Sequence, residues 1–378
     1  MTSNLRTLIS ATTTPLSSIF GSGFLIIVPI LAGAVGVFSV FAMAAVCALA
    51  YAVGSVIRYN ITHVEPVLAD KPPELTLSFE RISDLALILA YVISVCLYLH
   101  ILSSFVLGSF NADTELNENI LTTAIIVFIM AIGVTKGLDD LEVLEKWGLY
   151  ITLLIIVLLL AGFAIYDGSA WRSEAGITLF KATPHTPWEM LTIVAGTLIV
   201  VQGFETTRYL GDEFKANIRV SASRWSQIIS TSVYLLFIAA AMPLVHTLNG
   251  QYDDNSLIKL AGVASAILVA PLIIAATLSQ FSAAVADTLA ATGNMQETTH
   301  GELKAKFGTL LVGCGAIVLS WSADTLEIVA LASRAFAFYY MLQCLVAISV
   351  SKSTSQRIAM AVIATVLGFI TIFAVPAS

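Results

Sequence analysis

Apolar runs separated by short polar segments occupy almost the whole chain. A helix needs about 20 apolar residues to cross a bilayer. Eleven runs are candidate spans, with approximate limits 9–31, 34–57, 83–110, 119–135, 148–166, 189–211, 225–248, 257–286, 307–321, 325–350 and 357–375. The pattern predicts an all-α membrane protein with about eleven transmembrane helices in one transmembrane domain over residues 1–378. The first run leads directly into the second, so we expect no cleavable signal peptide.

The composition agrees with this prediction. Of the 378 residues, 58% are hydrophobic and only 11% are charged, and the mean hydropathy is +0.90. A soluble domain carries roughly 25% charged residues, so we expect most of the surface to face a lipid bilayer. No basic cluster suggests nucleic acid. The four cysteines lie in apolar runs without metal-ligand spacing, so we expect no disulfide, metal site or cofactor.

Lysine and arginine are distributed unevenly between the two sides that eleven spans would create. Fourteen of the 18 fall on the side of the N-terminus, three on the other (Arg172, Lys181 and Lys259), and Arg334 falls within a span. Cytoplasmic loops carry the excess of positive charge. We therefore expect a multi-pass protein of the cell membrane with a cytoplasmic N-terminus and an extracytoplasmic C-terminus.

Two spans contain residues that an ordinary bilayer helix avoids. The first carries Gly21, Ser22 and Gly23, and the sixth carries Gln202-Gly203-Phe204-Glu205. Glycine weakens a helix by about 1 kcal/mol relative to alanine, and a glutamate at this depth needs a partner or a wet cavity. Such residues predict that both helices open there, facing protein or water. The alternative is that the small residues only allow close helix packing.

The spacing of the two interruptions suggests a repeat. Spans one and six each begin a set of five, so the second set would run inverted. The repeats would cover about 9–166 and 189–350, with an extra helix at 357–375. Paired broken helices in an inverted repeat place a solute site at mid-membrane. Free N–H groups after a break suit an anionic group, and free carbonyls before it suit an amine or cation.

These motifs resemble those of the amino acid–polyamine–organocation (APC) superfamily, which has the LeuT-type fold of five plus five inverted repeats. Gly21-Ser22-Gly23-Phe24 resembles the family's Gly-Ser-Gly-Ile/Val signature, and Gly203-Phe204-Glu205 resembles its Gly-Phe-Glu. The resemblance implies that backbone around Ser22, Gly23 and Phe24 holds a substrate carboxylate. It also implies that backbone near Val201–Phe204, including Gln202 and Gly203, holds the amine. Phe204 lies next to the break and is a candidate for a gate above the solute.

The chain departs from the family where coupling ions bind. Span five has only Lys146, at its mouth, where many proton-coupled members carry a lysine within the helix. Sodium-coupled members have adjacent hydroxyls on helix eight, whereas Ser279 and Ser282 are three residues apart. The coupling ion therefore stays open between H⁺ and Na⁺, with both serines as candidates for coupling or gating.

Four other polar residues within spans have two interpretations each. Arg334 is either part of an outer gate or anion contact, or pairs structurally with Glu205 or another acid. Glu205 is a helix cap or the proton carrier. Asp287, expected near the cytoplasmic end of helix eight, is structural or couples the ion. His100 contacts solute, or is a buried imidazole bonded to a neighbouring hydroxyl; Tyr98 would face the other way.

The function predicted is a secondary transporter of an amino acid or related small amine, working by alternating access as a proton- or sodium-coupled symporter. An inorganic cation carrier of the same fold, for potassium or a metal, is the alternative. A membrane sensor that binds solute without transporting it is a third possibility. We expect no enzyme, because the sequence has no Ser/His/Asp set and no HExxH motif. The oligomeric state stays open.

Overall fold

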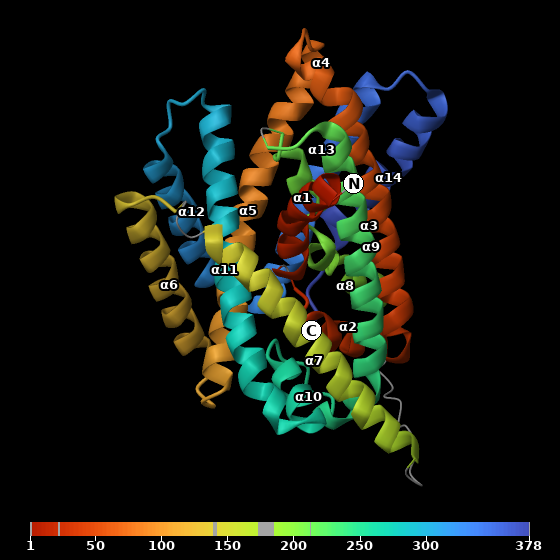
Figure 1. The fold of residues 1–378 in the computed structure, drawn as a ribbon, viewed down its shortest axis with the longest axis vertical. Helices are drawn as coiled ribbons and strands as arrows, with labels where there is room; N and C mark the ends of the chain where they lie inside the picture. Colours follow the sequence, from red (N-terminus) through yellow and green to blue (C-terminus); the bar gives the residue numbers. More distant parts are fainter. Residues whose placement is uncertain (1, 22, 139–141, 173–184, 212, 378) are drawn as a thin grey trace.

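A computed structural model describes residues 2–21, 23–138, 142–172, 185–211 and 213–377, and every regular element in these ranges is a helix (Figure 1). The long helices are α1 (Thr2–Gly21), α3 (Ser39–Tyr59), α5 (Glu74–Gly108), α6 (Glu115–Thr135), α7 (Glu142–Arg172), α9 (Ala216–Ala241), α11 (Val269–Thr298), α12 (Ala305–Ser320), α13 (Thr325–Val350) and α14 (Thr354–Phe373). The short helices are α2 (Ile27–Val35), α4 (Glu65–Ala69), α8 (Pro187–Ala195) and α10 (Ser256–Ala264).

Eight helical stretches in the described residues are long and apolar enough to cross a membrane. They are Ile27–Ala69, Glu74–Gly108, Glu115–Thr135, Trp147–Ser169, Ala216–Leu248, Ala266–Thr298, Thr325–Val350 and Thr354–Phe373. Large apolar side chains stay exposed on them, including Phe41 at 72%, Ile165 at 74% and Ile372 at 66%. In water such exposure over most outward faces would be costly, so the bundle is built to face lipid.

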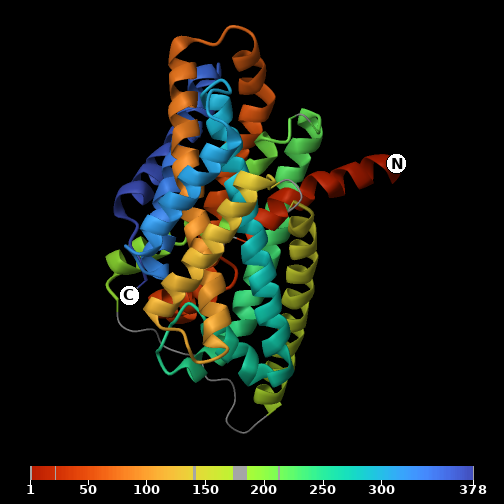
Figure 2. The same ribbon diagram turned by 90° about the vertical axis from the view of Figure 1, so that its left-hand side faces the viewer.

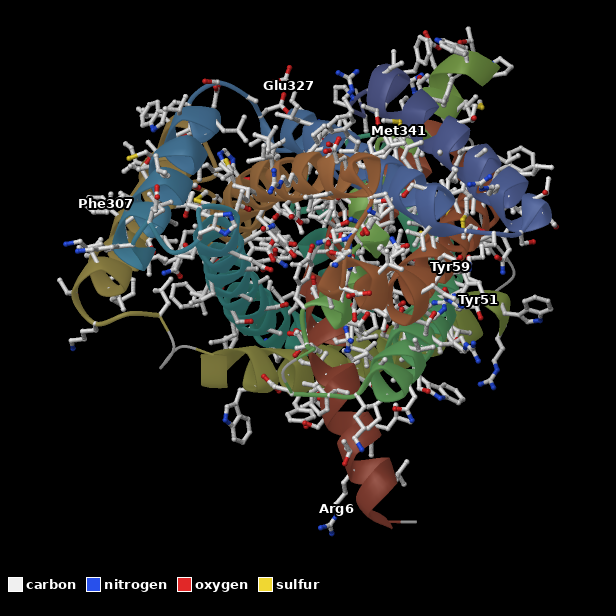
Figure 3. The ribbon with its side chains drawn as sticks, turned by 90° about the horizontal axis from the view of Figure 1, so that it is seen from above. Arg6, Tyr51, Tyr59, Phe307, Glu327 and Met341 are labelled. Atoms are coloured by element: carbon white, nitrogen blue, oxygen red, sulfur yellow. The ribbon has the colours of Figure 1, made fainter. Side chains whose placement is uncertain are left out.

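The centre of the bundle consists of α5 packed lengthwise against α11 and α13, with α1 packed against α9 (Figure 1). The outer end of α1 leaves this core: Leu5 and Ile9 are more than half exposed, and Figure 2 shows the N-terminal turns projecting from the bundle. Seen from above, Arg6 lies at the far tip of that projection (Figure 3).

Polar side chains cap the N-termini of α8 and α13 and explain where these two helices begin. Thr186 and Glu189 form a reciprocal capping box at the start of α8, and Asp324 and Glu327 form another at the start of α13. Each box pairs two backbone N–H groups that the first helical turn leaves unsatisfied. Both helices enter the core beside the functional site described below.

The expected limits of two spans were wrong. The run 257–286 is two elements, because Ser265 adopts an extended conformation (φ −169°, ψ 126°) between α10 and the short 3₁₀ turn Ala266–Leu268 that precedes α11. The second span continues past Arg58, whose guanidinium is buried and donates to Gln227 Oε1 at 2.6 Å. It passes through a π turn at Asn60–Val64, where the Asn60 amide donates to Gln343 Oε1 at 2.8 Å.

Candidate functional site

Two helices are interrupted in the core. α1 ends at Gly21 and α2 begins at Ile27, while the N–H groups of Ile26 and Ile27 both donate to the Gly23 carbonyl, at 3.1 and 3.2 Å. Ser22, expected at the centre of this interruption, lies outside the described residues. The second interruption follows α8 and consists of two 3₁₀ turns, Leu198–Val201 and Phe204–Arg208, separated by an extended Gln202 and by Gly203 at φ +126°. Both predicted breaks are present.

The two interruptions touch each other. A Cβ atom on Gly203 would lie 2.7 Å from the Ile19 backbone nitrogen, and one on Gly23 would lie 2.8 Å from Val200 Cγ2. A Cβ atom on Gly21 would meet that of Ala283 at 2.9 Å. The glycines therefore permit the irregular backbone at each break and also the close packing of the two segments, which were the two alternative interpretations.

Tyr234 links the two interruptions from α9. Its hydroxyl donates toward the Val200 carbonyl at 2.7 Å and the Ile19 carbonyl at 3.0 Å, and the side chain is fully buried. One side chain thus fixes the end of α1 to the 3₁₀ turn of the other broken helix. Sequence analysis missed this residue, because a tyrosine in an apolar run looks like packing.

Side chains of α13 bind the second interruption. The Ser333 hydroxyl donates to the Gly196 carbonyl (2.6 Å) and accepts from the Ile199 N–H (3.0 Å). The Tyr340 hydroxyl donates to Glu205 Oε2 at 2.7 Å, which also accepts from the Gly203 N–H at 2.8 Å. Glu205 is fully buried, and its Oε1 has no hydrogen-bond partner among the described residues.

Of the two candidates on α5, Tyr98 and not His100 reaches the break. The Gln202 amide donates to the Tyr98 hydroxyl at 3.0 Å. His100 Nε2 bonds to the Ser320 hydroxyl of α12 at 2.9 Å, and the ring borders a separate pocket with Glu118 and Asp254. His100 therefore has the geometry of the alternative interpretation, a buried imidazole bonded to a hydroxyl, and its contact with solute stays a prediction; the two side chains, two positions apart on one helix, face different ways.

A cavity of about 160 Å³ lies beside the breaks, between α1, the second 3₁₀ turn and α11. Its polar lining residues are Thr14, Ser17, Ser18, Thr206, Tyr209, Ser282 and Asp287. Asp287 is only 5% exposed and accepts a hydrogen bond from the Ser94 hydroxyl of α5. The expectation that Asp287 sits near the end of helix eight is wrong, because α11 continues to Thr298 through a polar sequence.

A larger cavity of about 850 Å³ adjoins the first, and Tyr209 lines both. Two ion pairs between a buried arginine and a partly exposed glutamate lie in its wall: Arg208 pairs with Glu80 of α5 at 2.6 Å, and Arg219 of α9 pairs with Glu65 of α4 at 2.6 Å. Arg208 also donates to Gln343 Oε1. The site is therefore open toward the end of the bundle that carries α4 and the projecting end of α1 (Figure 1).

Of the remaining predicted site residues, the two phenylalanines and Ser279 do not line the cavity, whereas Ser282 does. Phe24 packs on Phe237 with ring centroids 5.1 Å apart, and Phe204 stacks on Tyr340 at 5.2 Å. Ser282 lines the cavity, whereas Ser279 lies three residues away beside Phe24.

Arg334 points elsewhere. Its Nε donates to the Ala374 carbonyl at 2.6 Å, where the chain leaves α14. Among the described residues Glu205 bonds to Tyr340 and Gly203, so the suggested Arg334–Glu205 pair is wrong. An arginine in an apolar helix needs oxygen acceptors, and a backbone carbonyl supplies one here.

In the described part of the chain, no three His, Cys, Asp or Glu side chains are grouped in a way that could hold a metal ion. The breaks offer backbone groups, hydroxyls, one amide and a carboxylate. A helical membrane bundle with two interrupted helices meeting beside a buried polar cavity defines the class of solute transporters.

Comparisons with known proteins agree with this class. A family model described as APC superfamily transporter matches residues 3–375, and the chain belongs to this family. An uncharacterized protein of Aquifex aeolicus (strain VF5) is 38% identical over 368 residues, covering 95% of this chain and 89% of the relative.

Two solved structures share the fold at 13% identity and a TM-score of 0.57, each covering 97% of this chain and 85% of the other. Both are of the Eremococcus coleocola manganese transporter, one in complex with an aromatic bis-isothiourea substituted compound and one of a mutant in which a histidine is replaced by alanine.

Proposed function

We propose that the chain is a secondary transporter of amino acids or related small amines that works by alternating access across the cell membrane. The observation that carries the proposal is the contact between the two interrupted helices, where Gly203 lies against the Ile19 backbone and Tyr234 binds both segments. Interrupted helices of this kind expose backbone groups to solute near the bilayer midplane.

The proposed topology has eleven spans with a five-plus-five inverted repeat. α1, α8 with its following turns, and α12 add three spans to the eight apolar stretches, with α2 assigned to the first span and α3 to the second. The N-terminus would be cytoplasmic and the C-terminus extracytoplasmic, following the bias of Lys and Arg. The two adjoining cavities near Tyr209 and the projecting end of α1 then correspond to an inward-facing state.

The chemistry of the breaks favours an organic solute over copper, zinc or nickel. Among the described residues Gln202 and Ser18 are neutral polar side chains at the contact, whereas these metals prefer imidazole or thiolate ligands; Mn²⁺ also accepts oxygen ligands. The inorganic cation carrier is the second candidate, and the fold shared with the manganese transporter favours it. Buried carboxylates at Glu205 and Asp287 favour a proton as coupling ion.

Uptake into proteoliposomes tests the proposal. Purified protein would be supplied with a pool of labelled amino acids and amines under an inward proton gradient, and then under an inward sodium gradient. We expect gradient-dependent accumulation that is lost in Gly23→Leu and kept in the matched control Gly293→Leu, since Gly293 is exposed with no atom within 4 Å of its Cβ position. Accumulation of Mn²⁺ or K⁺ alone by folded protein would establish the second candidate instead.

A further inference from the structure

Among the described residues that line the cavity beside Asp287, the charged side chains are acidic only. Asp287 is its carboxylate, and no lysine or arginine is among the described residues that line it. The rest of the wall combines hydroxyl-bearing side chains with an aliphatic part formed by Leu210, Ala283, Val285, Ala286, Leu289 and Ala290. A volume of about 160 Å³ accommodates a small molecule of a few heavy atoms.

The hydroxyl groups in the wall present acceptors to this space. Thr206 Oγ1 donates its proton to the Gly203 carbonyl at 2.7 Å, and Ser282 Oγ donates to the Ser279 carbonyl at 3.2 Å. A hydroxyl whose proton is engaged has only lone pairs left to offer. Both groups therefore favour a ligand that donates hydrogen bonds.

Ser18 is a lining residue whose hydroxyl lacks a partner. Its Oγ is enclosed by protein and has no hydrogen-bond partner among the described residues, although other parts of the residue line the cavity. Buried polar atoms are nearly always satisfied in native proteins, so rotation of this side chain toward the cavity would gain a partner in a bound ligand. Ser18 also lies against Gly203, which places the cavity directly on the contact between the two breaks.

We infer that this cavity binds the primary ammonium group of a small organic cation, with Asp287, Thr206 and Ser282 as acceptors and Ser18 as a further oxygen partner. An ammonium has three donors and no acceptor, which matches this set of oxygens. The aliphatic wall takes a chain of a few methylene groups. This inference rests on the proposed function for its role as cargo, and it narrows the solute from amino acids and amines to primary amines without a carboxylate.

Binding can be measured without any gradient, which separates this inference from the transport proposal. The full chain in detergent micelles would be titrated with propylamine hydrochloride at neutral pH while thermal unfolding is followed. We expect propylammonium to raise the Tm by a few degrees at saturation, since a ligand of the folded state stabilises it. Tetramethylammonium, which has no N–H donor, and 1-propanol, which has no charge, should leave the Tm unchanged.

Two variants locate the site. Asp287→Asn should weaken propylammonium binding by about tenfold or more, because it removes a charged acceptor. Ser18→Ala, which keeps the Cβ atom against Gly203, should weaken binding less. Glu302→Gln is the matched control: Glu302 is exposed in the turn before α12 and lines no cavity described here, so this variant should bind like the parent protein.

Other outcomes would overturn the inference or separate it from the transport proposal. Equal Tm shifts with tetramethylammonium would mean a general cation effect, and a shift that survives in both Asp287→Asn and Ser18→Ala would place the amine elsewhere. No shift in parent protein would overturn the ammonium site even if amino acid uptake is found. A shift that depends on Asp287 in a protein without uptake would support the site and reject transport.

Discussion

The two interrupted helices are held in different ways. In its described residues the first break is short and apolar: Phe24, Leu25 and Ile26 are buried, and the backbone turns on the Gly23 carbonyl. The second is longer and polar, and side chains from other helices bind it at Gly196, Ile199, Gln202 and Glu205.

The difference indicates which break is fixed and which can move. The second break is bound to α5 and α13, the helices at the centre of the bundle. The first is bound across Tyr234 to α9, and the outer turns of α1 project from the bundle. In alternating access one set of helices moves against another, so the end of α1 is the segment that we expect to move while the second break stays with the scaffold.

The largest difference in uptake and stability between the two breaks should appear when one methyl group is added at Gly203 or at Gly23. In Gly203→Ala the new Cβ meets the Ile19 backbone nitrogen at 2.7 Å and the residue must keep φ +126°. In Gly23→Ala the residue must keep φ +157°, closer to extended backbone, and the new Cβ meets a Val200 methyl at 2.8 Å, which can shift. We expect Gly203→Ala to abolish uptake and to lower stability by more than about 2 kcal/mol.

Gly23→Ala should retain measurable uptake. Thermal unfolding and proteoliposome uptake check both variants, with Gly293→Ala as the control at an open position. Equal losses at the two glycines would remove the distinction between a scaffold-bound break and a mobile one.

Tyr234→Phe should have the next largest effect, because it deletes the hydroxyl that joins the breaks. Its loss from the Val200 and Ile19 carbonyls should cost about 1–3 kcal/mol of stability. Inhibition of uptake should exceed that expected from stability alone. Tyr150→Phe, on an exposed tyrosine of α7, is the control and should behave like the parent.

Ser333→Ala should act on the second break alone, with a cost of about 1–2 kcal/mol for the two backbone groups that lose a partner. In a double-mutant cycle, unfolding of Ser333→Ala with Tyr234→Phe should show coupling, because Tyr234 binds Val200 next to Ile199. Strict additivity would indicate that the two supports act on independent segments.

The smallest effect should be that of Tyr98→Phe, which removes one neutral hydrogen bond from Gln202 and costs about 0.5–1.5 kcal/mol. Because Gln202 lies at the break, the apparent KM for the transported solute should rise. His100→Gln should leave the KM unchanged, since the His100 ring faces Ser320 and the pocket beside Glu118. A KM effect in His100→Gln alone would establish His100 as the solute contact.

The sequence predicted the helical membrane fold and both breaks, because glycine, glutamine and glutamate are costly inside an apolar helix and stand out there. It could not predict what supports the breaks. Tyr234, Ser333 and Tyr98 lie in apolar runs where a hydroxyl is as consistent with packing as with binding a distant carbonyl.

Two errors have a common cause in the hydropathy signal. The run 257–286 hides the extended Ser265, since a single residue between apolar neighbours leaves the average unchanged. Asp287 was placed near a helix end because polar residues follow it, yet α11 continues to Thr298. Polar residues that face other helices, such as Thr288 and Thr292, are buried and do not mark the end of a helix.

The π turn at Asn60–Val64 has a practical consequence for labelling experiments on this chain. A π turn holds an extra residue in the coil, and each residue of an α-helix rotates the surface by about 100°. A cysteine-accessibility scan from Ser39 to Ala69 should therefore give a labelled stripe of helical period that changes phase once, at Asn60. A single helical wheel drawn for this segment would assign the residues after Val64 to the wrong face.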